Sequence, residues 1–270
     1  MSKENKVKVI DLNEDYKNLF FMCLEDWSDE MKEAGNHKEK WFDMMKDKGL
    51  RVKLAMNEKG EVGGMIQYIP IEHSFTAGEN LYIIKCIWVH GYQKGRGNFQ
   101  GRGMGKALIQ AAEADARSRG ARGMVAWGIP LPFWMKASWF KKQGYTKVDK
   151  MGLLGQVLLW KPFSDDAVPP RWIRMKKKPE SIPGKVKVTS FLNGWCPAQN
   201  IVHERAKRAS EEFGNLVEFE EIQTINRDVF LEWGISDALY INGKSVRTGP
   251  PPTFRKIRKI IARQVRKLKS

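Results

Sequence analysis

One stretch of the sequence constrains the fold more than any other: an apolar segment, a glycine-rich loop and a helical segment in direct succession. Residues 81–89, with the sequence LYIIKCIWV, are nearly all apolar and predict a buried central strand. The loop includes QGRGMGKAL, from Gln100 to Leu108, and a helix is expected from about Met104 to Arg119. A buried strand that leads through glycines into a helix is typical of α/β folds, in which helices cover a β-sheet.

The glycine-rich loop has the chemistry of a phosphate-binding site. Glycines let the backbone come close to a ligand, and the first N–H groups of the following helix have no partner within that helix. The positive end of the helix dipole attracts anions, and Arg102 and Lys106 add full positive charges beside those N–H groups. We therefore expect the loop to hold a pyrophosphate group.

Three glycine motifs compete for this loop. A P-loop requires Ser or Thr where this chain has Ala107, and a dinucleotide-binding motif requires an acidic residue at the end of the next strand, which ends here near Trp127. The third motif is Gln100-x-x-Gly103-x-Gly105, between a central strand and a helix. In this context it resembles the acetyl-CoA loop of the GNAT N-acetyltransferase family.

The resemblance covers about residues 1–162 and implies that acetyl-CoA is a cosubstrate. Backbone N–H groups of the loop would hold the coenzyme pyrophosphate. The end of the central strand would pair with the pantetheine arm as if the arm were an extra strand, because this strand splays from its neighbour in the family. The residues thereby assigned to the cofactor are Ile87, Trp88, Val89, Gln100, Gly101, Arg102, Gly103, Met104, Gly105 and Lys106.

The catalytic residues are less clearly marked. In this family a tyrosine often gives a proton to the leaving thiolate, and the matching position here is Phe140, which has no proton to give. Another group, such as Ser138 or water, would have to serve. The candidates for a base that accepts the amine proton are His90, just beyond the central strand, and Glu72 and His73, after the preceding strand. No metal is expected in this site.

The chain is expected to form two α/β domains. Its 270 residues exceed one typical domain. The composition changes after residue 162, where prolines and the run Lys176-Lys177-Lys178 favour an extended connection. We therefore expect a GNAT domain with a splayed mixed sheet over residues 1–162, a linker over residues 163–184, and a small β/α domain with a basic C-terminal helix over residues 185–270.

The second domain carries half of a redox signature. Residues 195–199, with the sequence WCPAQ, follow a strand and open a helix, and they resemble the Trp-Cys-x-x-Cys turn of thioredoxins. Gln199 stands in place of the second cysteine, which excludes a dithiol cycle within the motif. The later strand that begins with a cis-proline in thioredoxins has Ser236 or Asp237 at that place. An acetyltransferase followed by such a domain resembles the YoaP-like two-domain acetyltransferases.

The composition indicates which binding partners and which cellular compartment to expect. The net charge is +16, from 47 basic and 31 acidic residues, but no nucleic-acid-binding motif accompanies the charge, so we favour an ordinary basic surface over nucleic-acid binding. We expect no membrane span and no signal peptide. Three scattered cysteines form no disulfide framework, which fits a reducing cytoplasm, and a monomer or a homodimer is expected.

We expect the protein to transfer an acetyl group from acetyl-CoA to a small-molecule or peptidic amine by direct attack in a ternary complex. One alternative, which Phe140 favours, is a non-catalytic module that binds or senses acetyl-CoA. Another is a thiol-reactive thioredoxin-like binding protein, in which Cys196 forms mixed disulfides or, with His203, binds a soft metal. Aromatic residues near the expected acceptor region favour an acceptor with an apolar portion; they are Trp88, Trp127, Phe133, Trp134 and Trp139.

Overall fold

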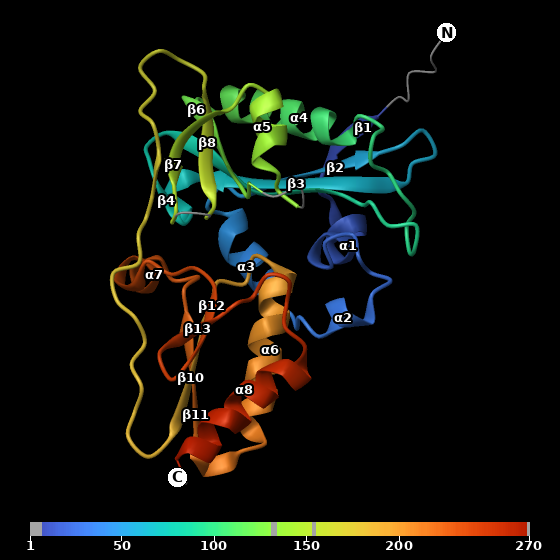
Figure 1. Cartoon of the computed structure of the whole chain (residues 1–270). Coiled ribbons are helices and arrows are strands. Elements are labelled where there is room, and N and C mark those ends of the chain that lie inside the picture. The colour runs from blue at the N-terminus through green and yellow to red at the C-terminus, as the bar shows by residue number, and fades with distance from the viewer. Residues whose placement is uncertain (1–6, 131–133, 153–154, 269–270) are drawn as a thin grey trace. The chain divides into compact units, whose positions relative to one another are not determined.

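The structure is a computed structural model that describes residues 7–130, 134–152 and 155–268 (Figure 1). The chain divides into two compact units. The first unit consists of Met1–Trp27 and Met44–Ile173, and the second of Ser28–Asp43 and Arg174–Ser270. Each unit contains its own β-sheet and helices, so the expected α/β class is confirmed for both.

These units differ from the expected domains in two places. Residues 28–43 group with the second unit, in which the guanidinium of Arg205 binds the carboxylate of Glu33 at 2.8 Å. The part of the expected linker up to residue 173 groups with the first unit, in which Trp172 pairs with Thr76 in a short sheet. Both attachments join residues that lie far apart in the sequence, and a change in composition does not reveal such contacts.

The first unit is built on a seven-stranded sheet with the strand order β1-β2-β3-β5-β6-β8-β7. Within it, β5 and β6 run parallel and the other neighbouring pairs are antiparallel. The strands are β1 (Lys8–Asp11), β2 (Arg51–Met56), β3 (Val62–Pro70), β5 (Leu81–Val89), β6 (Gly123–Gly128), β7 (Thr146–Lys150) and β8 (Val157–Pro162). A separate small sheet pairs β4 (Thr76–Ala77) with β9 (Arg171–Trp172).

Apolar patterns over residues 7–10, 50–56, 62–71, 81–89 and 123–127 predict five of these strands, but no such pattern marks β7. Its sequence, TKVDK, is mostly polar because β7 is an edge strand of the sheet and no strand covers its outer side. The sequence of residues 152–160, GLLGQVLLW, predicts a strand. This strand is β8, which begins later, at Val157. Residues 153–154 of that expected strand lie outside the described residues.

One long helix covers a face of the sheet in the first unit. Helix α4 (Met104–Ser118) packs across β1, β2, β3, β5 and β6 and buries Leu108, Ile109, Ala112 and Ala116 (Figure 1). The expected helix over residues 104–119 is therefore confirmed. The remaining helical elements of this unit are the 3-10 helices η1 (Glu14–Tyr16) and η2 (Ile71–His73), and the helices α1 (Lys17–Phe21) and α5 (Ala137–Lys142).

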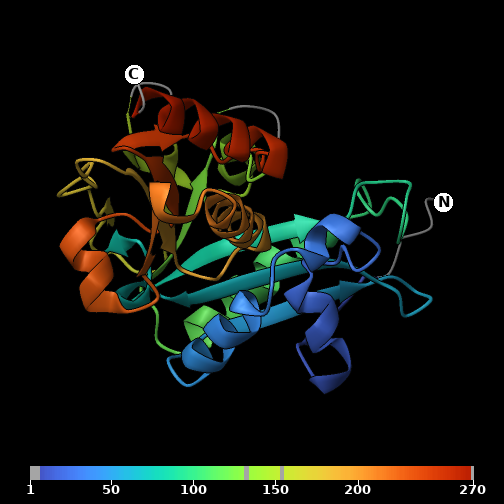
Figure 2. The ribbon, with the colours of Figure 1, turned by 90° about the horizontal axis from the view of Figure 1, so that it is seen from below.

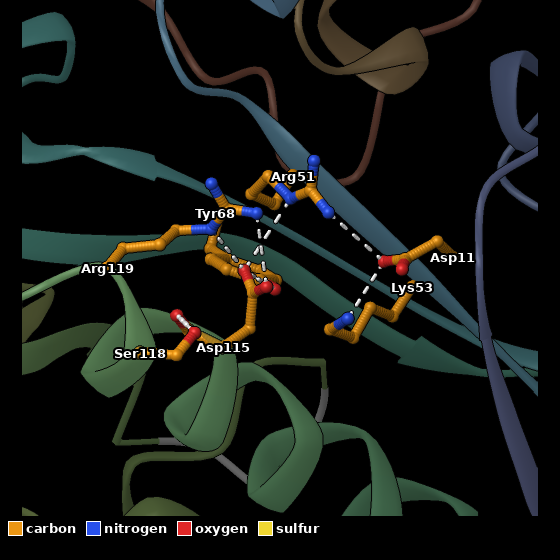
Figure 3. Close-up of polar contacts among 7 residues, drawn as sticks. All are labelled: Asp11, Arg51, Lys53, Tyr68, Asp115, Ser118 and Arg119. Carbon is orange, nitrogen blue, oxygen red and sulfur yellow. Dashed lines mark hydrogen bonds and ion pairs between the residues drawn. The ribbon is translucent and has the colours of Figure 1, made fainter.

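A polar network fixes the C-terminal half of α4 to the sheet (Figure 3). The carboxylate of Asp115 accepts hydrogen bonds from the Tyr68 hydroxyl at 2.8 Å and from the Arg119 guanidinium at 2.9 Å. Arg51 on β2 approaches the same carboxylate at 3.5 Å. Burial alone would raise the pKa of Asp115, but the hydrogen bonds from Arg119 and Tyr68 hold it below its usual value, so the carboxylate stays ionised.

The second unit contains a four-stranded sheet with the order β11-β10-β12-β13. Strands β10 and β11 are parallel, whereas β12 pairs antiparallel with both β10 and β13. Apolar runs in the sequence predict strands over residues 186–192 and 216–222 and a hairpin over residues 238–246, in agreement with these four strands. Their bounds are β10 (Val186–Leu192), β11 (Val217–Gln223), β12 (Ala238–Ile241) and β13 (Lys244–Val246).

Helices cover both faces of this second sheet. Helices α6 (Pro197–Glu211) and α8 (Phe254–Lys267) lie side by side and share one apolar core with Val186, Val188 and Leu239 (Figure 2). Helix α7 (Arg227–Trp233) packs on the other face, around Phe191 and Tyr240. The remaining helices are α2 (Asp29–Lys32), α3 (His37–Lys46), of which residues up to Asp43 belong to this unit, and the 3-10 helix η3 (Gly214–Leu216).

Among the described residues, no helix has the length and the apolar character that crossing a bilayer requires.

The Asp115 network predicts a measurable loss of stability. We expect Asp115→Asn to lower the free energy of unfolding by about 1–3 kcal/mol, because charge-assisted hydrogen bonds from Tyr68 and Arg119 are lost. Since folding lowers the pKa of this carboxyl, its contribution is present above the unfolded pKa and is lost as the pH falls. Urea unfolding at neutral and acidic pH measures both effects, with exposed Glu79→Gln as control; an equal difference at both pH values would contradict this account.

Candidate functional site

The two parallel strands at the centre of the first sheet separate soon after they begin. Strand β5 pairs with β6 through Leu81, Tyr82 and Ile83. Within the described residues, none of the positions from Ile84 to Val89 pairs with β6, although β6 continues to Gly128. The edge of β5 that faces away from β3 is therefore left without a strand partner along its second half.

A β-bulge lies where the separation begins. In the pairing of β3 with β5, Gln67 is opposite Cys86 and Tyr68 is opposite Ile84, so Lys85 is an extra residue on β5. A bulge bends its strand and increases the local twist, which turns β5 away from β6. The Trp127 side chain on β6 spans the separation, since its indole N–H donates to the Lys85 carbonyl at 3.0 Å.

The free edge of β5 offers backbone groups at alternate residues. The N–H of His90 donates to the Gly63 carbonyl on the β3 side. In an antiparallel pair the backbone groups alternate in direction, so Trp88 also faces β3, whereas Ile87 and Val89 face the free edge. Of the three residues assigned to pantetheine from the sequence, Ile87 and Val89 thus have the required orientation and Trp88 does not.

The glycine loop ends in an uncapped helix N-terminus. Helix α4 begins after Gly103, which has a φ of 83° and accepts no side-chain cap. Gly101 is also left-handed, with a φ of 76°, so both positions favour glycine. In the part of the chain that the structure describes, the N–H groups from Gly101 to Lys106 have no hydrogen-bond acceptor. These groups form a row of donors at the positive end of the helix dipole.

Side chains of the loop divide between structural and exposed roles. Met104 is buried, so only its backbone faces outward, whereas Arg102 and Lys106 are exposed. Gln100 donates its side-chain amide to the Val89 carbonyl at 3.2 Å and ties the loop to the end of β5. Beside the loop lies an open hollow of about 350 Å³, lined by Glu61, Gln93, Arg96, Gly97, Asn98, Phe99, Gln100 and Arg102.

His90 is enclosed and both of its ring nitrogens are occupied. Its Nδ1 lies 2.8 Å from the Gly97 carbonyl, which can only accept, so Nδ1 carries the hydrogen. Its Nε2 accepts the indole N–H of Trp27 at 3.0 Å. The ring is fully buried. In this arrangement no lone pair is available to take a proton from an amine, so the surroundings of His90 do not support the expected base.

Glu72 and His73 lie at the other end of the β3–β5 pair. They belong to η2, which follows the end of β3, where Pro70 is opposite Tyr82. The Glu72 carboxylate is exposed and accepts the N–H of Asn80 at 3.2 Å. At about 3.4 Å per residue, the length of β5 separates these residues from His90 by more than 20 Å. The structure therefore does not bring the three candidate bases together.

Phe140 occupies a purely apolar position. It is fully buried on α5, with ring centroids 5.1 Å from Trp139 and 5.7 Å from Tyr145. Burial raises the pKa of Tyr145 well above its usual value, so this phenol also stays un-ionised. Of the aromatic residues expected near the acceptor, Trp127 and Trp134 pack edge to face at 5.1 Å, and Phe133 lies outside the described residues.

Sequence reasoning missed a buried glutamine beside the bulge. The Gln67 side chain is fully buried, and neither its oxygen nor its nitrogen has a hydrogen-bond partner within the described residues. A buried amide without hydrogen bonds costs about 1–3 kcal/mol of stability, and a bound molecule that hydrogen-bonds to the Gln67 amide would recover this free energy. The only sequence signal was a single polar residue within the apolar strand VGGMIQYIP.

The His90 contacts predict its tautomer. We expect two-bond ¹H–¹⁵N correlation spectra to show a neutral ring protonated at Nδ1, because Gly97 accepts there and Trp27 donates to Nε2. Trp27→Phe should shift the Nε2 signal, whereas the signals of His73 should remain unchanged as an internal control. A ring protonated at Nε2 in the unaltered protein would contradict this geometry.

A comparison with models of protein families gives a match over part of the first unit. A family model described as "Acetyltransferase (GNAT) family" matches residues 10–131. No curated protein matches the chain.

Several solved structures resemble the chain at low identity. A GNAT family acetyltransferase from Brucella melitensis, solved with acetyl-CoA, is 17% identical with a TM-score of 0.41, over 61% of this chain and 92% of that one. The PaiA N-acetyltransferase from Thermoplasma acidophilum, solved with coenzyme A, is 13% identical with a TM-score of 0.42, over 58% and 99%. A GNAT family acetyltransferase from Staphylococcus aureus is 15% identical with a TM-score of 0.41, over 59% and 100%.

Similarity at this level says nothing about the substrate. The match to the family model and the observed geometry concern the same part of the first unit. Over residues 10–131 the chain matches the family model of GNAT acetyltransferases.

Proposed function

We propose that the first unit transfers an acetyl group from acetyl-CoA to a small-molecule or peptidic amine by direct attack in a ternary complex. The observation that carries the proposal is the row of backbone N–H donors from Gly101 to Lys106 beside the unpaired edge of β5. A donor row at a helix N-terminus suits a pyrophosphate, and an open strand edge suits an amide-containing arm. Coenzyme A carries both groups in one molecule.

Each part of the site has a role in this proposal. The N–H groups of the loop hold the pyrophosphate, and Arg102 and Lys106 supply positive charge beside them. Gln100, assigned to the cofactor from the sequence, acts instead through Val89, because its amide holds the Val89 carbonyl. The backbone groups of Ile87 and the N–H of Val89 bind the arm along the free edge, which brings the thioester toward the bulge at Lys85.

The reaction moves one proton overall. The amine nitrogen bonds to the thioester carbonyl carbon, the C–S bond breaks, and the amine proton passes to solvent while the thiolate takes one up. Phe140 has no proton to donate, so we infer that the thiolate leaves without a protein acid. The pKa of a thiol is about 8.5, so the thiolate is a weak base and leaves without prior protonation. We infer that a water molecule receives the amine proton, since His90 is engaged.

Gln67 is the polar side chain that we assign to the acceptor or the thioester. It lies opposite Cys86, next to the bulge, and its amide is unsatisfied within the described part of the protein. A bound carbonyl or amine next to the bulge would supply the missing hydrogen bonds. The amide would then position a reactant instead of transferring a proton.

Removal of the Gln67 amide predicts opposite effects on stability and activity. We expect Gln67→Leu to raise the free energy of unfolding by about 1–3 kcal/mol, because an unsatisfied buried amide disappears. We expect kcat/KM for the amine to fall by about 10-fold, equivalent to 1.4 kcal/mol. Thermal unfolding and steady-state kinetics measure both, with Gln223→Leu, an exposed glutamine, as control. Unchanged kinetics in a stabilised variant would remove Gln67 from the site.

Loss of the loop charges predicts weaker cofactor binding. We expect the double variant Arg102→Ala/Lys106→Ala to raise the Kd for acetyl-CoA by about 10-fold, because two cations beside the pyrophosphate are lost. Calorimetry measures this, with Lys142→Ala/Lys147→Ala as a control that removes the same charge from exposed positions elsewhere in the first unit. Absence of any heat with millimolar acetyl-CoA and the unaltered protein would overturn the proposed function.

A second candidate is a non-catalytic domain that binds or senses acetyl-CoA, which the buried Phe140 favours. Both candidates predict binding, so thiol release separates them. A panel of amines that includes aromatic amines, peptides, spermidine and aminoglycosides should give release of coenzyme A with the enzyme. We expect amines with an apolar portion to be preferred over polycations, because the protein carries a net charge of +16.

We infer that the second unit is a thioredoxin-like domain. The strand order β11-β10-β12-β13, with one parallel pair followed by two antiparallel strands, supports this inference. Cys196 directly precedes α6, as in the thioredoxin turn, and the Trp195 indole N–H donates to Asp237 at 3.0 Å. With Gln199 at the second cysteine position, we propose a binding role for this unit instead of a dithiol cycle.

A further inference from the structure

A group of metal-binding side chains comes together in the second unit. His37 at the start of α3 meets His203 and Glu204, which are neighbours on α6, and one ligand atom from each lies within 4.8 Å of the others. His37 Nε2 is 2.6 Å from Glu204 Oε1. The two imidazole rings are 5.3 Å apart and nearly perpendicular, at 84°. Two segments far apart in the sequence thus bring two imidazoles and a carboxylate to one point.

A carboxylate and a hydroxyl hold the two ring nitrogens of His203. Its Nε2 is 3.0 Å from the carboxylate of Glu221 on β11, and its Nδ1 is 2.9 Å from the buried Ser190 hydroxyl on β10. Imidazoles that bind metals usually hold their second nitrogen in such a hydrogen bond. In the metal-free protein the Nε2 hydrogen donates to Glu221 and Nδ1 accepts from the Ser190 hydroxyl. When a metal ion binds Nε2, the ring hydrogen moves to Nδ1 and donates to the Ser190 oxygen, so the imidazole stays neutral.

The distances suit a small ion. Zinc bonds to imidazole nitrogen and carboxylate oxygen are about 2.0–2.2 Å, so a tetrahedral site places its ligand atoms roughly 3.4 Å apart. The observed separations of 2.6 Å for His37–Glu204 and 3.0 Å for His203–Glu221 are slightly shorter, as expected when a proton occupies each pair. The ligand atoms of His37, His203 and Glu204 lie within 4.8 Å of one another, so these three can close around an ion and a water molecule can complete four-fold coordination. The carboxylates of Glu204 and, beside His203, Glu221 would offset its double charge.

An unsatisfied oxygen beside this group is an independent sign of a missing partner. Asn200 is fully buried, and its Oδ1 has no hydrogen-bond partner within the described residues. It lies one turn before His203 and Glu204 on the same face of α6. Its Nδ2 donates to the Gly194 carbonyl at 2.9 Å, and a Cβ at Gly194 would lie 3.0 Å from the His37 carbonyl. A water molecule on the metal could donate to this oxygen.

The group is buried on one side and open on the other. The side chain of His203 is 2% exposed, whereas those of His37 and Glu204 are 17% and 27% exposed. An ion can therefore enter past His37 and Glu204 and come to rest against His203. The absence of thiolates and the presence of two imidazoles favour a borderline divalent ion over calcium or magnesium, which take oxygen ligands.

We propose that His37, His203 and Glu204 bind one divalent transition-metal ion of the zinc type, with Glu221 as a nearby carboxylate that contacts His203. This site does not depend on acetyl transfer. Its ligands belong to residues 28–43 and to α6, so the ion ties that inserted segment to this helix of the second unit. Ion binding should therefore raise the stability of the second unit according to its affinity.

The test uses the untagged full-length protein after removal of metals with a chelator. We expect one equivalent of Co²⁺ to give the visible absorption of four-coordinate cobalt, and Zn²⁺ to displace it. His203→Ala and Glu204→Gln should each weaken Co²⁺ binding by about 100-fold or more. His73→Ala and Glu218→Gln, which change the same residue types elsewhere, should bind as the unaltered protein does.

Because His203 is buried, its variant can fail to fold, so a second variant at the open side keeps the test decisive. His37→Gln removes a half-buried ligand, and circular dichroism checks its fold. Retained cobalt absorption in folded His37→Gln and Glu204→Gln would overturn the proposal, as would no binding by the unaltered protein at millimolar Co²⁺. Acetyl-CoA binding measured in the same samples reports separately on the first unit.

Discussion

The extra residue in β5 is the feature on which the candidate site depends. Lys85 interrupts the pairing of β5 with β3, and from there β5 turns away from its parallel neighbour β6. Parallel neighbours require a crossover connection, and here that connection is the glycine loop with α4. The same topology therefore produces both a free strand edge and a helix whose N-terminus begins near the end of that edge. The bulge at Lys85 thereby combines the free strand edge and the helix N-terminus into a single site.

The two ends of α4 have different roles because they have different partners. Near its C-terminus, Asp115 binds Tyr68 on β3 and lies close to Arg51 on β2, which fixes the helix to the sheet (Figure 3). At the N-terminus, backbone donors from Gly101 to Lys106 have no acceptor within the described part of the chain. A helix that is held at one end presents the donors at the other end in a fixed position. Such preorganisation lowers the cost of binding an anion.

Local patterns in the sequence predicted the strand over residues 81–89, the loop and α4, because each depends on residues close together in the chain. The bulge at Lys85 and the enclosed ring of His90 depend on contacts with β3 and with Trp27, so spacing alone did not reveal them. The cluster at His37 is the extreme case, since 167 residues separate it from Glu204. No spacing motif extends over such a distance.

The absence of a proton donor at Phe140 lowers activity less than its position in the family pattern suggests. General acid catalysis contributes about 10²- to 10⁴-fold, and it helps least when the leaving group is a weak base such as a thiolate. Orientation of two bound reactants can supply about 7–11 kcal/mol, more than the missing acid. A chain that keeps the loop donors and the free edge of β5, but lacks that acid, therefore retains the larger part of the rate enhancement. On these magnitudes a slower enzyme is favoured over a sensor that has lost all chemistry.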